Sequence, residues 1–376
     1  MTLVAAAAVS LTSIPAAAHD STSRQPAAAG AGVQAAAAPG TPRLPGGLSA
    51  LSWMVADADT GSVLAAKNPH RKLPPASTLK TLFAVTVLPK FSAGTVRRVS
   101  SADLAGIGAG SSVVGVKEGR RYSVADLWRG VFLRSGNDAV HVLAAMNGGW
   151  RNTAQEMQET ARRLGARDTT VKSPDGYDAP GQVSSAYDLT VFARAGLAND
   201  DFARYCATPR AAFPGAGGTT MIENTNRILV GSHGLSRYPG IIGVKNGYTS
   251  KAGNTLIAAA RRNGRTLLVT VLNPQSNENN AVYKEAGSLL DWGFDSAGTA
   301  QPVGTLHAVR TSYDGGGSLR PAATELTAAE AGGGSPRRSA LVLGAGAAGI
   351  VAIGLGALFG RRRQARGRAG QGSGPA

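Results

Sequence analysis

Two predicted β-hairpins lie far apart in the chain, and together they constrain the fold more than any other feature. The first covers residues 47–66, where two apolar runs flank the turn cluster Asp59-Thr60-Gly61-Ser62. The second is GNTLIAAARRNGRTLLVTVLN, in which Asn263-Gly264 joins two apolar runs as a tight hairpin turn. Apolar residues spaced at three and four predict helices over residues 77–90, 123–146, 152–164 and 279–292. Strands at both ends with helices between them predict an α+β fold in which one mixed sheet joins the N- and C-terminal segments.

The two ends of the 376-residue chain are non-globular in composition, which leaves residues 45–298 as the folded domain. Residues 3–18 form an apolar stretch that ends in Ala16-Ala17-Ala18, so residues 1–18 predict a secretory signal peptide with an A-x-A cleavage site. The usual basic n-region is missing, which leaves a start further upstream, an atypical signal or an Ala-rich tail as alternatives. Residues 19–44 are rich in Ala, Gly, Pro and Ser and predict a flexible spacer.

An uncharged run near the C-terminus predicts a membrane anchor. Residues 339–360 carry no charged side chain, and a helix of this length, about 33 Å, crosses the hydrocarbon core of a bilayer. Five arginines follow in residues 361–376, and the positive-inside rule places this basic tail in the cytoplasm and the folded domain outside the cell. Residues 299–338 predict a flexible tether. A buried helix of a soluble domain is the alternative for the uncharged run.

Composition excludes several classes of function. The net charge is +16, but seven arginines without any acidic residue lie after residue 336, and no run of Lys and Arg is interleaved with aromatic residues. Nucleic-acid binding is therefore disfavoured, and an anionic cell-wall or lipid surface is the expected partner. One cysteine, Cys206, allows no disulfide, and the five His residues lack metal-binding spacing, so no metal is expected.

The first chemical motif is Ser77-Thr78-Leu79-Lys80, at the start of a predicted helix. Residues i and i+3 share a helix face, so the Ser77 hydroxyl and the Lys80 amine can meet. An amine kept neutral by burial or a nearby cation can remove the serine proton. None of the other eight lysines follows a serine at this spacing. A solvated helix face is the alternative.

The second motif is Ser135-Gly136-Asn137, in an expected loop between helices. Ser135 could relay a proton to a leaving group, and Asn137 could hydrogen-bond the backbone on the acyl side of a substrate. A polar turn in which either residue caps a helix is the alternative.

The third motif is Lys245-Asn246-Gly247, which follows an apolar run. It predicts a strand that exposes a cation and a hydrogen-bond donor, with glycine letting a ligand approach the backbone. A hairpin turn is the alternative, because Asn-Gly is also a good turn dipeptide.

In this order the three motifs resemble those of the penicillin-recognising serine enzymes. Within that group, residues 48–298 resemble the low-molecular-mass D-alanyl-D-alanine carboxypeptidases, the S11 peptidase family. The likeness extends over the stretches WMVADADTGSVLAAKNPHRKLPPASTLK, SPDGYDAPGQVSSAYDLTVFAR, ENTNRIL, VKNGYTSKAGNT and SLLDWGF. The resemblance implies a penicillin-binding or β-lactamase-like transpeptidase fold, with a mixed sheet flanked by helices and a helical subdomain.

The resemblance also implies the reaction and its catalytic residues. The enzyme would remove the terminal D-Ala from peptidoglycan stem pentapeptides without a cofactor, and β-lactams would inhibit it covalently. Ser77 would attack the D-Ala–D-Ala carbonyl with Lys80 as general base. Ser135 would relay the proton to the departing D-Ala.

The remaining site residues would bind the substrate. Asn137 would hold the acyl-side amide, while Lys245 and Asn246 would bind the terminal carboxylate, with Gly247 beside them. Lys245 would also help to keep Lys80 neutral. The backbone N–H groups of Ser77 and Tyr248 would form the oxyanion hole.

Two departures from the family pattern concern the carboxylate pocket. Asn246 stands where the family usually has Thr or Ser, and it is larger but can still donate a hydrogen bond. Relatives commonly carry an Arg shortly before the closing helix motif, whereas no Arg occurs between Pro274 and Trp292. A weaker or differently built pocket is therefore expected.

Two other functions fit the same motifs. A serine β-lactamase needs a Glu, soon after the second motif, that activates water for deacylation. The candidate Glu223 lies only 22 residues before Lys245, too late in the chain for that role. A non-catalytic wall-binding relative is the other alternative, if Asn246 has abolished turnover.

Overall fold

The computed structural model describes residues 32–35, 38–215, 217–296 and 298–307, together with the backbone of residues 311–313 and 319–321. The predicted signal peptide, anchor helix and basic tail lie outside these residues, as do most of the spacer and tether. Among the described residues, no helix combines the length and apolarity needed to cross a bilayer.

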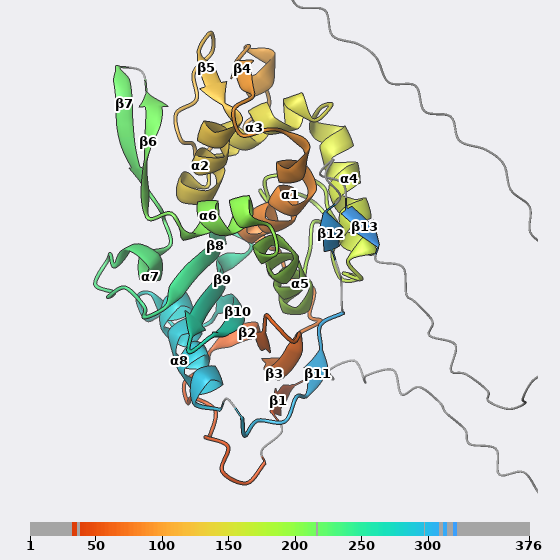
Figure 1. Cartoon of the computed structure of the whole chain (residues 1–376), viewed down its shortest axis with the longest axis vertical. Coiled ribbons are helices and arrows are strands. Elements are labelled where there is room, and N and C mark those ends of the chain that lie inside the picture. The colour runs from red at the N-terminus through yellow and green to blue at the C-terminus, as the bar shows by residue number, and fades with distance from the viewer. Residues whose placement is uncertain are drawn as a thin grey trace, which may run out of the picture. The chain divides into compact units, whose positions relative to one another are not determined.

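A seven-stranded sheet forms the centre of the described body (Figure 1). Both predicted hairpins are confirmed, and they supply the central strands. Their strands are β2 (Ala50–Asp57) with β3 (Ser62–Lys67), and β9 (Gly253–Arg262) with β10 (Arg265–Pro274). β2 pairs with β10, so the sheet joins the N- and C-terminal segments as predicted. The strand order is β1-β3-β2-β10-β9-β8, where β1 is Val33–Ala35 and β8 is Ile241–Thr249, and the seventh strand, β11 (Gly304–Thr305), also pairs with β3.

The prediction of a mixed sheet is wrong, because every pairing of this sheet is antiparallel. Hairpins reverse direction at each turn, and the two hairpins meet with β2 and β10 running in opposite directions. All helices but the last are inserted between β3 and β8, which are not neighbours, and the last helix follows β10, so no parallel crossover is required.

Two short strands come from segments that the sequence assigned to the spacer and the tether. β1 (Val33–Ala35) and β11 (Gly304–Thr305) both pair with β3, and Leu306 is buried. The folded body therefore extends beyond residue 298. Such short edge strands carry no periodic signal of their own, because the free edge of β3 supplies their hydrogen-bond partners.

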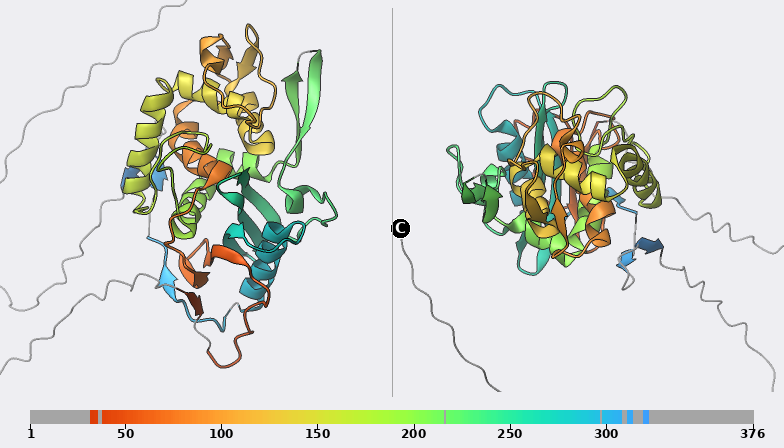
Figure 2. Two further views of the ribbon diagram at one scale, coloured as in Figure 1. Left: turned by 180° about the vertical axis from the view of Figure 1, so that it is seen from behind. Right: turned by 90° about the horizontal axis from the view of Figure 1, so that it is seen from above.

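Helices cover both faces of the sheet, as Figures 1 and 2 show. The helix α8 (Ala281–Asp295) packs on one face around Trp53 and Leu289. A larger apolar core on the other face includes residues of α1 and α5. Its helices are α1 (Lys80–Val87), α2 (Val124–Arg134), α3 (Asn137–Met146), α4 (Trp150–Arg163), α5 (Ala186–Leu197) and α6 (Asp200–Ala207).

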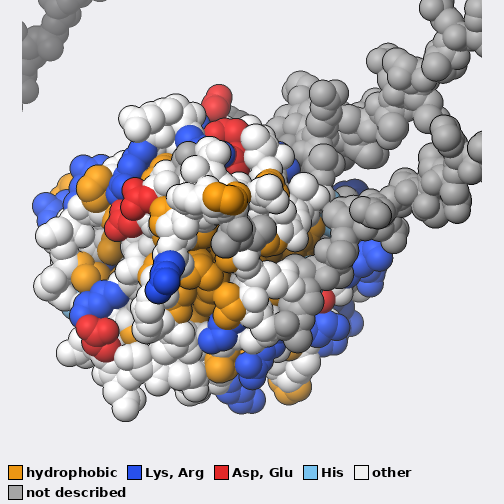
Figure 3. Space-filling model, turned by 90° about the horizontal axis from the view of Figure 1, so that it is seen from below, with side chains coloured by type: hydrophobic (Ala, Val, Ile, Leu, Met, Phe, Trp, Pro, Cys, Tyr) orange, Lys and Arg blue, Asp and Glu red, His pale blue; other side chains and the backbone are white. Residues whose placement is uncertain are grey.

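Short elements connect these layers. They are the 3₁₀ helices η1 (Ala76–Leu79), η2 (Leu88–Lys90) and η3 (Ala102–Leu104), the helix α7 (Arg227–Val230), and the two-stranded sheets of β4 (Val96–Arg98) with β5 (Arg121–Ser123), β6 (Arg210–Gly215) with β7 (Gly218–Glu223), and β12 (Thr311–Tyr313) with β13 (Leu319–Pro321). On the face that Figure 3 shows, Lys and Arg side chains lie at several separate places rather than in one track.

Local side-chain chemistry sets the helix boundaries near the site. A capping box between Ser123 and Asp126 starts α2. The predicted helix over residues 123–146 is in fact two helices, because Ser135 takes a left-handed conformation (φ 56°) and ends α2. Gly136 then precedes the first turn of α3. This break is the loop in which the second motif was expected.

Candidate active site

The nucleophile motif lies where η1 runs into α1. Lys80 Nζ donates hydrogen bonds to Ser77 Oγ at 2.8 Å and to the backbone oxygen of Asp175 at 2.7 Å. The Lys80 side chain is buried, with only 1% of its surface exposed. The expected meeting of hydroxyl and amine is therefore confirmed, and the alternative of a solvated helix face is wrong.

Two buried amines of this region, those of Lys80 and Lys245, have lowered pKa values. Burial lowers the pKa of Lys80 from 10.5 to about 8, although the carboxylates of Asp175 and Asp138 favour its charged form. Burial, and after it the charge of Lys80, lowers the pKa of Lys245 well below its usual value. Their mutual repulsion disfavours a state in which both amines are protonated.

The third motif lies within β8 and not at a turn, so the hairpin alternative is wrong. Lys245 pairs across the sheet with Ile257, on the face that α1 covers, and its Nζ donates to the backbone oxygen of Asn246 at 2.8 Å. Asn246 pairs with Leu256 on the opposite face, toward α8. There its Oδ1 accepts a hydrogen bond from Thr225 Oγ1 at 3.0 Å.

Glycine is required at two positions where other segments cross the start of η1. A Cβ on Gly247 would lie 2.7 Å from the backbone nitrogen of Ser77, and a Cβ on Gly176 would lie 2.1 Å from the backbone oxygen of Ala76. Gly176 also has a φ of 79°. Thr255 Oγ1, on the strand next to β8, donates to the Pro75 backbone oxygen at 3.1 Å and fixes the same crossing.

The backbone at this crossing is strained. Ala76, directly before the nucleophile, has a φ of 50°, a left-handed conformation that costs a non-glycine residue on the order of 1 kcal/mol or more. The close contacts with β8 and with the loop of Gly176 hold it there. Ser77 and Tyr248 therefore lie on two segments that are in van der Waals contact. An oxyanion hole made of the backbone N–H groups of these two residues requires such a contact.

The second motif presents polar atoms that have no partner among the described residues. Ser135 Oγ and Asn137 Oδ1 are buried without a hydrogen bond to protein atoms there. Asn137 Nδ2 donates to Ser111 Oγ at 3.1 Å, and its backbone N–H donates to Ser112 at 2.7 Å. Neither motif side chain caps α3, but the backbone of Ser135 forms the left-handed C-cap of α2, so the alternative of a helix-capping turn is correct for Ser135 and accompanies the unpaired side-chain atoms. A buried unpaired hydroxyl and amide oxygen are suited to hydrogen-bonding a ligand.

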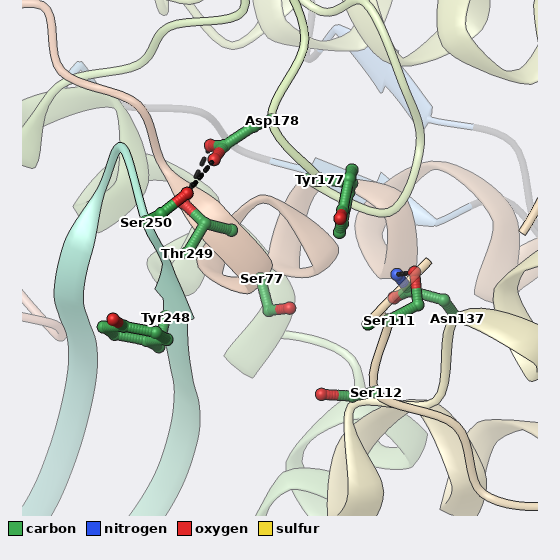
Figure 4. A pocket seen from close by; sticks show the side chains of 11 residues that line it. Ser77, Ser111, Ser112, Asn137, Tyr177, Asp178, Tyr248, Thr249 and Ser250 are labelled. Carbon is green, nitrogen blue, oxygen red and sulfur yellow. Dashed lines mark hydrogen bonds between the residues drawn. The ribbon is translucent and has the colours of Figure 1, made fainter. Parts of the chain in front are cut away.

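A cleft opens above Ser77, and Figure 4 shows the side chains that surround it. Of the residues in the three motifs, Ser77 and Asn137 line this cleft. Tyr248, which is 67% exposed, lines it as well. The other lining residues are Gly110, Ser111, Ser112, Gly176, Tyr177, Asp178, Thr249 and Ser250. The first two motifs thus share one cleft through Ser77 and Asn137, whereas the third motif contributes no lining residue and meets Ser77 through the close backbone contact of Gly247. The remaining predicted site residues, Lys80, Ser135, Lys245 and Asn246, do not line the cleft.

Two segments of this site were not predicted from the sequence. The segment that carries Ser111 and Ser112 is held by Asp138, whose carboxylate accepts hydrogen bonds from the backbone N–H groups of residues 114–116 at 2.8–2.9 Å. An acidic residue beside Asn137 was the available signal. The loop of Asp175 supplies the carbonyl that orients Lys80. Its SPDGYD sequence was noted only as part of the family likeness.

Comparison with known proteins identifies the family. The family model of peptidase S11, D-alanyl-D-alanine carboxypeptidase, matches residues 35–276. The chain belongs to this family. It is therefore a serine D-alanyl-D-alanine carboxypeptidase with an α+β fold of the penicillin-binding-protein type.

Several relatives document the likeness. The D-alanyl-D-alanine carboxypeptidase DacB2 of Mycobacterium tuberculosis is 41% identical over 248 residues, which are 65% of this chain and 82% of that protein. Escherichia coli DacD is 34% identical over 263 residues, which cover 66% of this chain and 64% of DacD. The chain therefore spans less than two thirds of the longer E. coli relative.

Solved structures agree with these matches. The crystal structure of a D-alanyl-D-alanine carboxypeptidase from M. tuberculosis superposes with a TM-score of 0.66 at 38% identity, covering 72% of this chain and all of that one. Penicillin-binding protein 6B from E. coli superposes with a TM-score of 0.61 at 33% identity, over 69% of this chain and 82% of that one.

Proposed function

We propose that this S11 enzyme removes the terminal D-Ala from peptidoglycan stem pentapeptides through an acyl-enzyme on Ser77. The observation that carries the proposal is the 2.8 Å contact between Lys80 Nζ and Ser77 Oγ in a buried setting that lowers the Lys80 pKa to about 8. A neutral amine at that distance can take the hydroxyl proton as the oxygen attacks.

The first half-reaction forms the ester. Ser77 Oγ bonds to the carbonyl carbon of the penultimate D-Ala while its proton passes to Lys80 Nζ. The backbone N–H groups of Ser77 and Tyr248 stabilise the oxyanion. The C–N bond then breaks, and the proton reaches the departing amine through Ser135, whose buried hydroxyl lacks a protein partner among the described residues. Water finally hydrolyses the ester and regenerates Ser77.

The leaving D-Ala carries a carboxylate that Lys245 is proposed to bind, whereas Asn246, expected from the sequence to share this role, points to the opposite face of β8. A carboxylate beside Lys245 favours its protonated form, and that charge lowers the pKa of Lys80 further. Substrate binding would thereby promote the neutral state of the general base. Gly247 keeps the backbone of β8 close to Ser77, so that Ser77 and the residues of β8 can act on the same ligand.

The side chain of Asn246 is turned away from Lys245, to the α8 face of β8. Its Oδ1 accepts from Thr225 and its side chain also hydrogen-bonds Tyr283, so direct contact with the carboxylate is assigned to Lys245, and Asn246 acts on it at longer range. Thr225 in turn accepts from Tyr283 through its backbone oxygen, at 3.3 Å. The guanidinium of Arg227 lies 5.7 Å from the Tyr283 ring centroid and adds positive charge on this side of β8.

We propose that the catalytic domain acts outside the cell, delivered by residues 1–18 and retained by a membrane helix over residues 339–360. The support is the apolar stretch with its small-residue exit, and the uncharged run followed by five arginines. Expression of the full chain in a related host tests this. The proposal expects a cleaved N-terminus by mass spectrometry and loss of membrane association when residues 339–376 are deleted.

Fluorescent-penicillin labelling followed by a D-Ala release assay tests the reaction. The proposal expects a long-lived adduct that disappears in Ser77→Ala and remains in Ser101→Ala, an exposed serine outside the cleft. D-Ala should then be released from a pentapeptide. An adduct that turns over rapidly would indicate the β-lactamase alternative, and no adduct would indicate a wall-binding relative. Glu223, the β-lactamase candidate, pairs with Arg210 at 2.6 Å and does not line the cleft.

A further inference from the structure

The cleft above Ser77 has a single charged residue in its lining. Among the described residues, Asp178 is the one lining residue of the Asp, Glu, Lys, Arg or His type, and the rest are Ser, Thr, Tyr, Asn and Gly. Figure 4 shows the Asp178 carboxylate directed toward Thr249 and Ser250 at one end of the cleft. A lone carboxylate in a neutral polar cleft makes that end attractive to a cation.

The hydrogen bonds of Asp178 leave acceptor capacity free. Oδ1 accepts from Thr249 Oγ1 at 2.8 Å, while Oδ2 has only long contacts, at 3.3 Å to the backbone N–H of Lys251 and at 3.5 Å to Ser250 Oγ. All three donors are neutral, and no ion pair of Asp178 occurs within the described part of the chain. A carboxylate has about four lone-pair sites, so it can still receive a charged donor.

Asp178 lies in a loop beside the C-terminal end of β8, where it contacts Thr249. This place indicates which part of a substrate its carboxylate would meet. Lys245, proposed to bind the leaving D-Ala, lies on one side of the reaction centre at Gly247 and Tyr248. Thr249 and Ser250 lie on the other side, which is the acyl side. A strand advances about 3.3 Å per residue, so an extended peptide alongside β8 has its residue before the D-Ala pair near Thr249 and Asp178.

We propose that Asp178 binds a primary ammonium on the side chain of the residue that precedes the D-Ala pair. This inference rests on the proposed function and narrows its substrate class. The preferred peptides end in X-D-Ala-D-Ala, where X carries an unacylated amine. A stem whose amine has been acylated by a neighbouring stem presents a neutral amide there and is a poorer substrate. The enzyme therefore acts on stems that have not yet accepted a crosslink.

A pair of peptides that differ only in charge tests the inference. The peptides are Nα-acetyl-L-Lys-D-Ala-D-Ala and its Nα,Nε-diacetyl analogue, and kcat/KM for D-Ala release is measured for each. The wild type should favour the free amine about tenfold, which corresponds to about 1.4 kcal/mol. In Asp178→Asn, which keeps an oxygen for Thr249, the ratio should fall to about one. In Asp201→Asn, an exposed carboxylate on α6 paired with Arg204, the ratio should stay near ten.

The ratio of kcat/KM for the two peptides, measured with the same enzyme, separates charge recognition by Asp178 from a merely structural role. Damage to the cleft would lower kcat/KM for both peptides by the same factor and leave their ratio unchanged. A norleucine peptide in the wild type gives the same comparison without a variant, and it should behave like the diacetyl peptide. Equal rates on charged and neutral peptides in the wild type, or a tenfold ratio that persists in Asp178→Asn, would overturn the inference. Failure of the wild type to release D-Ala from either peptide would instead overturn the proposed function.

Discussion

The pH dependence of acylation is the most direct consequence of the geometry around Ser77. Lys80 can accept the serine proton only when its amine is neutral, and its pKa is about 8. The neutral fraction, calculated from that pKa, is about 1% at pH 6, about 9% at pH 7 and about 50% at pH 8. The second-order rate constant for acylation by a penicillin should therefore rise roughly 50-fold between pH 6 and pH 8.

The sign of this change follows from the need for a neutral amine, and the pKa shift sets how large the neutral fraction is at each pH. Burial disfavours the charged ammonium, so Lys80 loses its proton at a lower pH than a free lysine would. An unshifted lysine with a pKa of 10.5 would remain almost fully protonated at pH 8, and the neutral fraction would then be below about 1%. The carboxylate of a penicillin stays ionised over this range, so the ligand contributes no titration of its own.

Stopped-flow or quenched labelling with a fluorescent penicillin, at concentrations well below saturation, measures this constant. A melting temperature at each pH serves as a control, because the pKa of Asp188 is raised by burial to about 6 and its titration affects the fold in the same range. Lys80→Arg, which stays protonated, should show no acylation at any of these pH values. A rate constant that changes less than about threefold from pH 6 to pH 8 would refute the role assigned to Lys80.

Three further predictions concern single substitutions. Lys80→Met should abolish labelling yet raise the melting temperature. The pKa shift from 10.5 to about 8 means that burying the charged amine costs roughly 3 kcal/mol of folding free energy, which the neutral Met side chain avoids. Calorimetry showing a lower melting temperature would contradict this. Gly247→Ala should slow acylation on the order of 100-fold while circular dichroism stays unchanged, because its Cβ would meet the Ser77 nitrogen at 2.7 Å; unaltered acylation kinetics would contradict the close crossing. Asn246→Asp should raise KM for D-Ala release on the order of tenfold or more by repelling the substrate carboxylate, whereas Asn246→Thr should not, and equal KM values for the two variants would place the carboxylate elsewhere.

Features encoded by neighbouring residues were predictable from the sequence. The hairpin at Asn263-Gly264 follows from turn chemistry, and the approach of Lys80 to Ser77 follows from the i, i+3 geometry of a helix. The order of the three motifs, read as a family resemblance, correctly indicated the fold type and the enzyme class. Each of these inferences needed only a few adjacent residues, or a pattern that related proteins share.

The tertiary structure decided how distant segments complete the site. The backbone carbonyl that orients Lys80 belongs to Asp175, 95 residues further along the chain. At one end of the cleft, Asp178 accepts a hydrogen bond from Thr249, which lies 71 residues further along the chain. The direction of the sheet pairings and the turning of Asn246 toward α8 likewise depended on which strands meet. Local patterns specify the element and the side-chain spacing. Which distant residue packs against a given side chain is decided only when the whole chain folds and buries its apolar surface. The two segments that meet carry no sequence pattern that names each other, because the contact stabilises both of them only once they are packed together.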